Sequence, residues 1–468
     1  MKSQTVSENP KPKCGVELDT GTSDQSGKEL NSSGAARYPE SKVGEDKSTT
    51  VPLCSTTTQT CHHYLAIFIG WFLGNALLFL WNAILNAGDY FYSVFPDYHP
   101  SRVLPLLYIP VAFAIACGFL ITAKAPGNIR LRVLNGFSIF LMAAISIIIV
   151  SACEGARLLG TRLTFIAICV LVVTSSIGEG VCGGGLLGEF SFMDPVYLQA
   201  FNAGMAASGI ATTGLRMITK YIFGDTAGGL RRGGVTFFAM SAVVHLVGIF
   251  LYAIVFSRLE GVKTYRQKAV AQESKTVDVV TSVNDVELGH ESGRNVSSEK
   301  SNLDREWSKM DLLFENWDYV LDTVVLYAVT FSINPGFLYE NTGSHTLGTW
   351  YPLILLAIFN STDFLSRIFR IERLFMRSRR YLAVSCCGLV LLFIPGFYFG
   401  ARYGGTSLMM VLCGLLGAAN GYLTVCIFDS APVGFKSLEQ SVIGAMLYIA
   451  TLGGLTIGLA ADWFWQIH

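Results

Sequence analysis

The segment that decides the fold runs from Thr236 to Phe256 and reads TFFAMSAVVHLVGIFLYAIVF. Its 21 residues include no Asp, Glu, Lys or Arg, and a helix needs about 20 mostly apolar residues to cross a bilayer. Within lipid a chain must satisfy its own backbone hydrogen bonds, so a segment of this length is expected to be helical. Similar apolar runs follow one another from Cys61 to His468, which predicts an all-α polytopic membrane protein.

The bulk composition agrees with this fold class. Hydrophobic residues make up 51% of the chain and charged residues 15%, whereas soluble domains have about 25% charged residues. The formal net charge of zero gives no indication of a nucleic-acid partner. The 11 cysteines show neither a disulfide framework nor a metal-ligand spacing. We therefore expect no metal and no cofactor.

Four segments are expected along the chain. Residues 1–60 are rich in Ser, Thr, Lys and Glu and predict a disordered cytoplasmic tail. Residues 61–258 predict transmembrane helices one to six, and residues 319–468 predict helices seven to eleven. Between them, residues 259–318 predict a cytoplasmic central loop, and the apolar spacing at its end favours a short amphipathic helix. The expected spans lie near 61–86, 103–124, 131–152, 161–187, 195–221, 232–258, 319–340, 350–371, 380–401, 406–429 and 437–465.

Positive charges in the short loops determine the expected orientation. Lys124, Arg130 and Arg132 lie between the second and third spans, and five arginines lie within residues 370–380 after the eighth span. Because Lys and Arg are enriched in cytoplasmic loops, these loops and the N-terminus are expected in the cytoplasm. An odd number of spans then places the C-terminus outside the cell. Basic residues that disagree with this orientation flank the gap between spans five and six, at Lys220, Arg231 and Arg232.

The eighth span contains a pair of ionisable residues. Asp363 and Arg367 are four residues apart and therefore share one face of a helix. An acid at the centre of a span costs roughly 2.5–3.5 kcal/mol on insertion scales, and such residues are usually functional. One interpretation is a site for substrate hydroxyl groups, or a gate. The other is that Arg367 extends to the lipid headgroups and merely neutralises Asp363.

The first span has Trp81 and Asn82 in its interior, away from the interfaces where tryptophan is usually enriched. Trp81 either stacks on a flat ligand or packs between helices. Asn82 hydrogen-bonds either to that ligand or to a neighbouring helix. In the fifth span, Arg216 and Lys220 lie towards the outer end, and their long side chains are expected to extend to the headgroups.

The fourth span has Glu179 within the run GEGVCGGG at residues 178–185. The run matches GxGxxG, but no strand–turn–helix context surrounds it, so a dinucleotide site is rejected. The glycines instead predict a close crossing of helices. Low-dielectric surroundings favour the neutral form of a carboxyl group, so Glu179 is either a proton carrier or a structural acid paired with a base elsewhere. No nucleophile–base pair, metal-ligand cluster or phosphate loop is found, and an enzyme is not expected.

Taken in order along the chain, the motifs resemble the equilibrative nucleoside transporter family, and most of all its plant branch. Each motif is weak alone, but their order across eleven spans is specific. The resemblance extends from about Gly70 to the C-terminus, apart from most of the central loop. The motifs are Trp81-Asn82, Asp89-Tyr90-Phe91, the run from Val94 to Arg102, Gly185 to Gly188, Leu215 to Lys220, Pro335 to Asn341, Asp363 with Arg367, and Asn420 to Cys426.

The resemblance implies a fold and a substrate. It implies eleven spans in a six-plus-five arrangement related to the major facilitator architecture, with alternating access to a central site. It also implies nucleosides such as adenosine and uridine as substrates. The eighth-span acid and arginine of the family contact the ribose, which implies this role for Asp363 and Arg367. Members similar to this chain are commonly proton-coupled importers, with an acid at the position of Glu179.

The resemblance further implies a base pocket. It consists of the first-span tryptophan and its neighbours, here Leu78, Trp81, Asn82 and Leu85, together with the fourth-span position occupied here by Gly183. Many members have a base-reading Gln or Lys at that last position. In this chain the polar contact to the base is therefore missing or supplied elsewhere.

These arguments predict a nucleoside transporter that imports its substrate with a proton, acting as a monomer in the plasma membrane rather than the vacuolar membrane. Its expected partners are nucleosides, protons and the lipid bilayer. One alternative is a facilitator-type carrier of nucleobases, sugars or another small polar solute, although residues 123–132 lack the acid that such carriers usually have there. The other is a non-transporting receptor, which would not need Glu179 and Asp363 to be buried.

Overall fold

The computed structural model describes most of the chain from Leu53 onwards. The predicted disordered tail, apart from its last residues, and most of the predicted central loop lie outside the described residues. The described ranges are 53–122, 129–155, 160–191, 193–224, 226–268, 307–334, 336–340, 347–368, 378–403 and 405–466.

Helices form most of the described part of the chain, which contains no strand, so the predicted all-α class is confirmed. Nine of the described helices are long and apolar enough to span a membrane, whereas α6 and α12 do not meet this criterion. The long helices of the first half are α1 (Leu53–Asn86), α3 (Pro100–Thr122), α4 (Ile129–Gly155), α5 (Thr161–Ser191), α6 (Pro195–Phe223) and α7 (Ala227–Phe250). Those of the second half are α10 (Trp317–Ile333), α12 (Tyr351–Ile368), α13 (Arg379–Tyr403), α14 (Thr406–Ser430) and α15 (Ser437–Asp462).

Short helices connect the long ones. A π-helical turn, η2 (Leu251–Val255), and a 3₁₀ turn, η3 (Phe256–Arg258), continue α7, and residues 260–268 are helical as well. The other short elements are α2 (Gly88–Val94), η1 (Pro96–Tyr98), α9 (Lys309–Glu315), α11 (Gly336–Glu340), η4 (Gly348–Trp350) and η5 (Trp463–Gln466). In α9, Leu312 is buried while Met310 and Phe314 are exposed, so this helix has one apolar face outside the bundle.

The predicted seventh span, 319–340, is not one continuous helix. It divides into α10 and α11, and the break falls at Asn334, whose φ of −114° and ψ of 127° are extended. Asn334 precedes Pro335 in the sequence, and the ring of a proline disfavours the α conformation of the residue before it. The prediction of a single helix ignored this local restriction.

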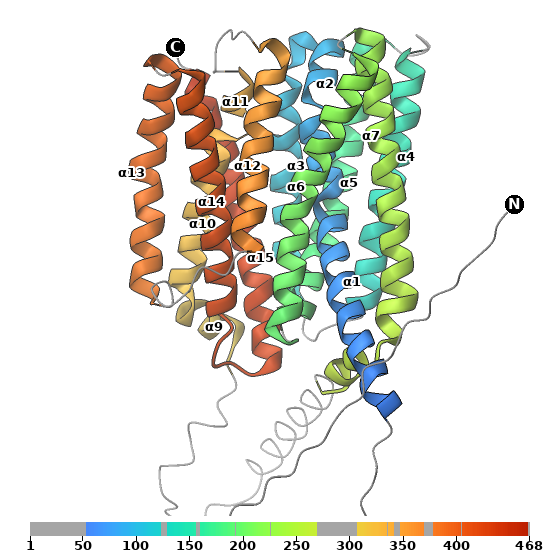
Figure 1. The fold of residues 1–468 in the computed structure, drawn as a ribbon, viewed down its shortest axis with the longest axis vertical. Helices are drawn as coiled ribbons and strands as arrows, with labels where there is room; N and C mark the ends of the chain where they lie inside the picture. Colours follow the sequence, from blue (N-terminus) through green and yellow to red (C-terminus); the bar gives the residue numbers. More distant parts are fainter. Residues whose placement is uncertain are drawn as a thin grey trace, which may run out of the picture. The chain divides into compact units, whose positions relative to one another are not determined.

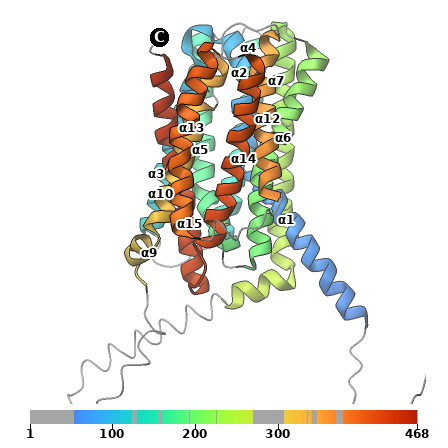
Figure 2. The same cartoon turned by 60° about the vertical axis from the view of Figure 1, so that its left-hand side comes forward.

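The long helices lie side by side as one bundle (Figure 1). The start of α1, the end of α7 and α9 lie at one end of the bundle, here termed the α9 end (Figures 1 and 2). Helix α2 and the C-terminal end of α15 lie at the opposite end of the bundle, here termed the α2 end (Figure 1). The two halves meet along two seams. In one seam α15 packs on α3 and α5, and in the other α6 packs on α12 and α14.

The glycines of α5 allow the close helix crossings that their pattern predicts. A methyl group added at Gly180 would lie 2.8 Å from the carbonyl oxygen of Ala112 on α3. One added at Gly178 would lie 3.0 Å from the carbonyl oxygen of Gly136 on α4. Such distances leave no room for a side chain, so the glycine run brings α5 against both neighbours.

Candidate functional site

Asp363 and Arg367 of α12 form a buried ion pair with two contacts. Arg367 Nε lies 3.1 Å from Asp363 Oδ2, and Arg367 Nη2 lies 3.2 Å from Asp363 Oδ1. Their side chains are 8% and 7% exposed. The interpretation in which Arg367 extends to the headgroups is therefore wrong, because the guanidinium reaches back towards the preceding helical turn and is enclosed by neighbouring helices.

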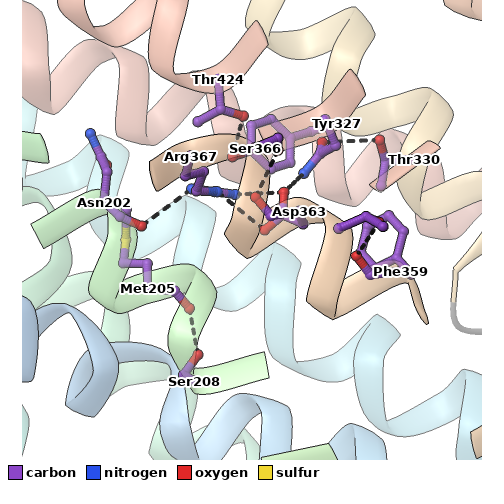
Figure 3. A network of polar contacts seen from close by, with 12 residues as sticks. Asn202, Met205, Ser208, Tyr327, Thr330, Phe359, Asp363, Ser366, Arg367 and Thr424 are labelled. Atoms are coloured by element: carbon purple, nitrogen blue, oxygen red, sulfur yellow. Dashed lines mark hydrogen bonds and ion pairs between the residues drawn. The ribbon is translucent and has the colours of Figure 1, made fainter. Parts of the chain in front are cut away.

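A network of polar side chains from α10 and α14 surrounds this pair (Figure 3). Asn420 Nδ2 donates a hydrogen bond of 2.9 Å to Asp363 Oδ1, and its own Oδ1 accepts one of 3.1 Å from Thr330. The hydroxyl groups of Tyr327 and Thr424 lie 3.2 Å apart in the same network. Asp363 therefore has a cation and an amide as donors, and its carboxylate is held in one orientation.

The network also reaches α6, which belongs to the other half of the bundle. Arg367 Nη1 donates to the carbonyl oxygen of Asn202 at 3.5 Å (Figure 3). Asn360, one turn before Asp363, donates from Nδ2 to the hydroxyl of Thr213 at 2.9 Å. The ion pair thus lies in the α6–α12 seam, where relative movement of the two halves would change its surroundings.

Asn82 hydrogen-bonds to a neighbouring helix, which is the second of the two roles predicted for it. Its Nδ2 donates to the hydroxyl of Ser208 on α6 at 2.7 Å. One turn further along α1, Asn86 Oδ1 accepts from the hydroxyl of Thr213 at 3.0 Å. Hydrogen bonds of this kind between transmembrane helices contribute about 0.6–2 kcal/mol each, and these two join α1 to α6.

Trp81 is buried, with an exposed fraction of 4%. Its ring centroid lies 4.6 Å from that of Tyr108 on α3, with a tilt of 37° between the planes. Leu78 and Leu85, at spacings of three and four residues from Trp81, are half-buried on the same helix. These three side chains share one face of α1.

Glu179 is buried in the α5–α15 seam, with an exposed fraction of 2%. The hydroxyl of Tyr448 donates to its Oε1 at 3.1 Å. Within the described residues, neither Glu179 Oε2 nor the hydroxyl of Tyr108 has a hydrogen-bond partner, and no Lys, Arg or His forms an ion pair with this carboxyl group. The interpretation of Glu179 as an acid paired with a base thus finds no partner in the described part of the chain.

Gly183 lies one turn after Glu179 and faces the ring of Tyr448. A methyl group added there would overlap the phenol oxygen and would lie 2.8 Å from Tyr448 Cε1. The space beside Gly183 is therefore filled by a side chain from the other half of the bundle. Sequence reasoning missed both Tyr448 and Tyr108, and a phenol in the interior of a span was the one available signal.

The predicted site residues form two groups. In the first group, Trp81 packs on Tyr108, Tyr108 interacts with Glu179, and Tyr448 contacts both Glu179 and Gly183. In the second group, Asp363 and Arg367 belong to the network around Asn420. Among the described residues no hydrogen bond or ion pair connects the two groups directly. Asn82 lies next to Trp81 in sequence and bonds to α6, the helix that contacts Arg367.

A cavity of about 260 Å³ opens beside the first group, at the α9 end of the α5–α15 seam. Gly180 and Gly184, which flank Glu179 and Gly183 in sequence, form part of its wall, and α3 and α15 form much of the rest. Lys309 at the start of α9 lies at the same cavity and donates to the carbonyl oxygen of Leu120 at 2.7 Å. Neither Trp81 nor Asp363 lines this cavity.

The prediction that Arg216 and Lys220 extend to the headgroups is wrong. Their exposed fractions are 1% and 3%. Arg216 Nη2 lies 2.6 Å from Asp89 Oδ1, and Lys220 Nζ lies 3.5 Å from Asp89 Oδ2. Lys220 also lies over the ring of Trp350, 5.4 Å from its centroid. The acid that draws both cations inward comes from α2, a separate short helix that the span pattern did not reveal.

An ion pair also links the two halves of the bundle at the α2 end. Arg102 at the start of α3 lies 3.9 Å from Asp462 at the end of α15, and both side chains are buried. The same guanidinium lies 5.6 Å from the ring centroid of Trp463. Together with the contact between Lys220 and Trp350, this pair joins α3 to α15 and α6 to η4.

Comparison with solved structures shows which fold the bundle has. The fold resembles a bacterial homologue of the iron transporter ferroportin in an outward-facing state with soaked iron, with a TM-score of 0.55 and 14% identity over 85% of this chain and 91% of that chain. A bacterial homologue of the human lysosomal transporter Spinster gives a TM-score of 0.50 at 13% identity, covering 85% of this chain and 81% of that one. The chain is a multi-pass membrane protein with the fold of a transporter.

Sequence comparisons narrow the class further. Residues 168–467 match the family model described as "Nucleoside transporter". Equilibrative nucleotide transporter 3 of Arabidopsis thaliana is 39% identical over 86% of this chain and 95% of its own length. Equilibrative nucleotide transporter 2 of the same plant is 38% identical over 89% and 98%. The chain therefore belongs to the equilibrative nucleoside transporter family, in its plant branch.

Proposed function

We propose that this protein transports nucleosides such as adenosine and uridine across a membrane by alternating access, and that import is coupled to a proton. The observation that carries the proposal is the ion pair of Asp363 and Arg367 in the α6–α12 seam. A seam between two halves is where a substrate meets both of them during alternating access. The family to which the chain belongs supports nucleosides as the substrate class.

The carboxylate of Asp363 suits a ribose hydroxyl. A carboxylate offers about four acceptor positions. Arg367 and Asn420 occupy two on Oδ1, and Arg367 occupies one on Oδ2. One acceptor position on Oδ2 is left for a sugar hydroxyl, while the guanidinium fixes the carboxylate plane. The base is assigned to the face of α1 formed by Leu78, Trp81 and Leu85, with Asn82 and Gly183 at its edges.

The proton is assigned to Glu179. Its carboxyl group is buried without a cation in the described residues, and the environment of such a group favours its neutral form. A group that is neutral in one conformation and ionised in another carries a proton across the membrane with the substrate.

The proposed topology has eleven spans, with the N-terminus in the cytoplasm, the C-terminus outside the cell and the protein a monomer in the plasma membrane. The basic starts of α4 and α13 lie at the α9 end, where Arg132 of α4 lines the same cavity as Lys309 and Arg379 of α13 pairs with Glu315 of α9, and this supports the assignment of the α9 end to the cytoplasmic side. We include α6 and α12 as spans because their charged residues Arg216, Lys220, Asp363 and Arg367 are buried between helices rather than facing lipid.

The test is uptake of labelled adenosine and uridine into proteoliposomes, with a panel of nucleosides, nucleobases and sugars as competitors. Asp363→Ala is expected to abolish uptake, and Asp318→Ala serves as the control because it removes a surface pair with Arg379 instead. Competition by sugars but not by nucleosides would favour a different carrier. Wild-type uptake by Asp363→Ala would reject the role in ribose binding.

A further inference from the structure

We infer that Tyr448 is a positioning residue for Glu179, and that position 183 is a glycine so that the phenol can reach the carboxyl group. The inference rests on the proposed function, because it concerns the proton step of the transport cycle. This role involves no contact between Tyr448 and the substrate. It acts by hydrogen-bonding the group that holds the proton.

The contact crosses from one half of the bundle to the other. Tyr448 belongs to α15 and Glu179 to α5, and the phenol oxygen lies 3.1 Å from Glu179 Oε1 and 3.5 Å from the carbonyl oxygen of the same residue. Tyr448 is 5% exposed and Glu179 is 2% exposed. A donor on one half and an acceptor on the other can stay in contact only while this seam is closed.

Tyr448 makes the hydrogen bond to Glu179 that has good geometry. From α3, the hydroxyl of Tyr108 interacts with the same carboxyl group and is a second donor available to it, although it makes no hydrogen bond of good geometry there. From α5 itself, the thiol of Cys182 is nearby and buried. From α4, Arg132 donates to the carbonyl oxygen of Val181 at 3.3 Å and not to the carboxyl group. The hydrogen bond from the hydroxyl of Tyr448 therefore contributes to the stability of the ionised form of Glu179.

This geometry connects the proton to the movement of the halves. A hydrogen bond donated to a carboxylate favours its ionised form. While the seam is closed, burial favours the neutral carboxyl group, and the hydrogen bond from Tyr448 offsets part of that preference. When the seam opens, the burial and the hydrogen bond are lost together, and the carboxyl group exchanges its proton with hydronium ions of the adjoining solution, at Oε2, the oxygen without a partner among the described residues.

Gly183 provides a matched pair of variants. A methyl group at Gly183 would overlap the phenol oxygen, whereas one at Gly184 comes no closer than 3.8 Å to Tyr448. Gly183→Ala is therefore expected to displace the phenol from Glu179, and Gly184→Ala is expected to leave it in place. Both substitutions add the same methyl group to the same helix.

The experiment measures adenosine uptake into proteoliposomes as a function of external pH. In Tyr448→Phe the carboxyl group holds its proton more tightly, so the pH of half-maximal uptake is expected to rise by about one unit or more, the size expected for one hydrogen bond to a charged group. Gly183→Ala is expected to shift it in the same direction. Gly184→Ala and Tyr351→Phe, which alters a buried tyrosine on α12, are expected to keep the wild-type profile.

The outcomes separate the inference from the proposed function. If Glu179→Gln leaves the pH dependence intact, Glu179 is not the proton site and the proton part of the proposed function fails. If Glu179→Gln removes the pH dependence while Tyr448→Phe keeps the wild-type profile, only the inference about Tyr448 fails. If Tyr448→Phe does not fold, the Gly183→Ala and Gly184→Ala pair makes the same comparison, and equal profiles for the two would overturn the inference.

Discussion

Removing Arg367 tests whether the buried pair on α12 stabilises the protein, binds substrate, or does both. In Arg367→Ala, Asp363 keeps only the amide of Asn420 as a donor and remains buried at 8% exposure of its side chain. Breaking a buried ion pair by deleting one partner costs about 3–5 kcal/mol, because the other charge is left uncompensated. Arg367→Ala is therefore expected to unfold at a clearly lower temperature than the wild type and to lose uptake.

A second variant separates stability from binding. Replacing both charges, in Asp363→Asn with Arg367→Gln, removes the uncompensated buried charge that destabilises the single variant. The double variant is therefore expected to regain most of the lost thermal stability. It is not expected to regain uptake, because an amide offers a ribose hydroxyl neither the charge nor the fixed plane of the carboxylate.

The assay combines thermal unfolding in detergent, followed by tryptophan fluorescence, with uptake of labelled uridine into proteoliposomes at equal protein content. Arg379→Ala is the control, because its pairs with Glu315 and Asp318 lie at the surface and exposed pairs contribute at most about 1 kcal/mol. Wild-type uptake by the double variant would refute the role in substrate binding. Wild-type stability of Arg367→Ala would refute the argument from an uncompensated buried charge.

Three further substitutions have expected outcomes. Trp81→Phe is expected to raise the KM for nucleosides in uptake assays, because a smaller ring covers less of the base, while Trp317→Phe at the exposed start of α10 is expected to leave KM unchanged. Asp89→Ala leaves Arg216 and Lys220 buried without their acid and is expected to destabilise the protein by about 3–5 kcal/mol; a melting temperature equal to that of Asp318→Ala would contradict this. Gly180→Ala is expected to lower the melting temperature, because the added methyl group would lie 2.8 Å from the backbone of α3. Its control, Gly118→Ala, adds a methyl group in open space. This control is expected to raise the melting temperature slightly, since alanine favours a helix by about 1 kcal/mol over glycine.

The sequence predicts the helices well because their signal is local. Thr161 and Pro195 are the first residues of α5 and α6, as expected from the apolar runs. The seventh span is the exception, since its break depends on the dipeptide Asn334-Pro335 rather than on hydropathy. The hydropathy of a segment indicates whether it can enter lipid. A single proline hardly changes that hydropathy, although it restricts the backbone of the residue before it.

The partners of polar side chains are not local, and here sequence reasoning is weaker. Asp363 and Arg367 are found from spacing alone because both belong to one helix. Arg216 was assigned to the headgroups because its acid, Asp89, is more than a hundred residues away in the chain. Tyr448 lies still further from Glu179 and has no charge to attract notice. Such pairs become visible only when the helices are placed next to one another.

Buried charged pairs involve both α6 and α12, the two long helices whose composition is least like that of a membrane span. Among the long described helices, α6 and α12 are less apolar than a typical membrane span, and both direct charged residues into the bundle. On α6, Arg216 and Lys220 are buried against Asp89, and on α12 Asp363 and Arg367 are buried beside Asn420. In the proposed alternating-access cycle the seam between the two halves opens to water, and a seam made of apolar side chains alone would expose apolar faces to water in each cycle. Charged and hydrogen-bonded side chains tolerate both states, so reduced apolar character is expected in helices that line such a seam.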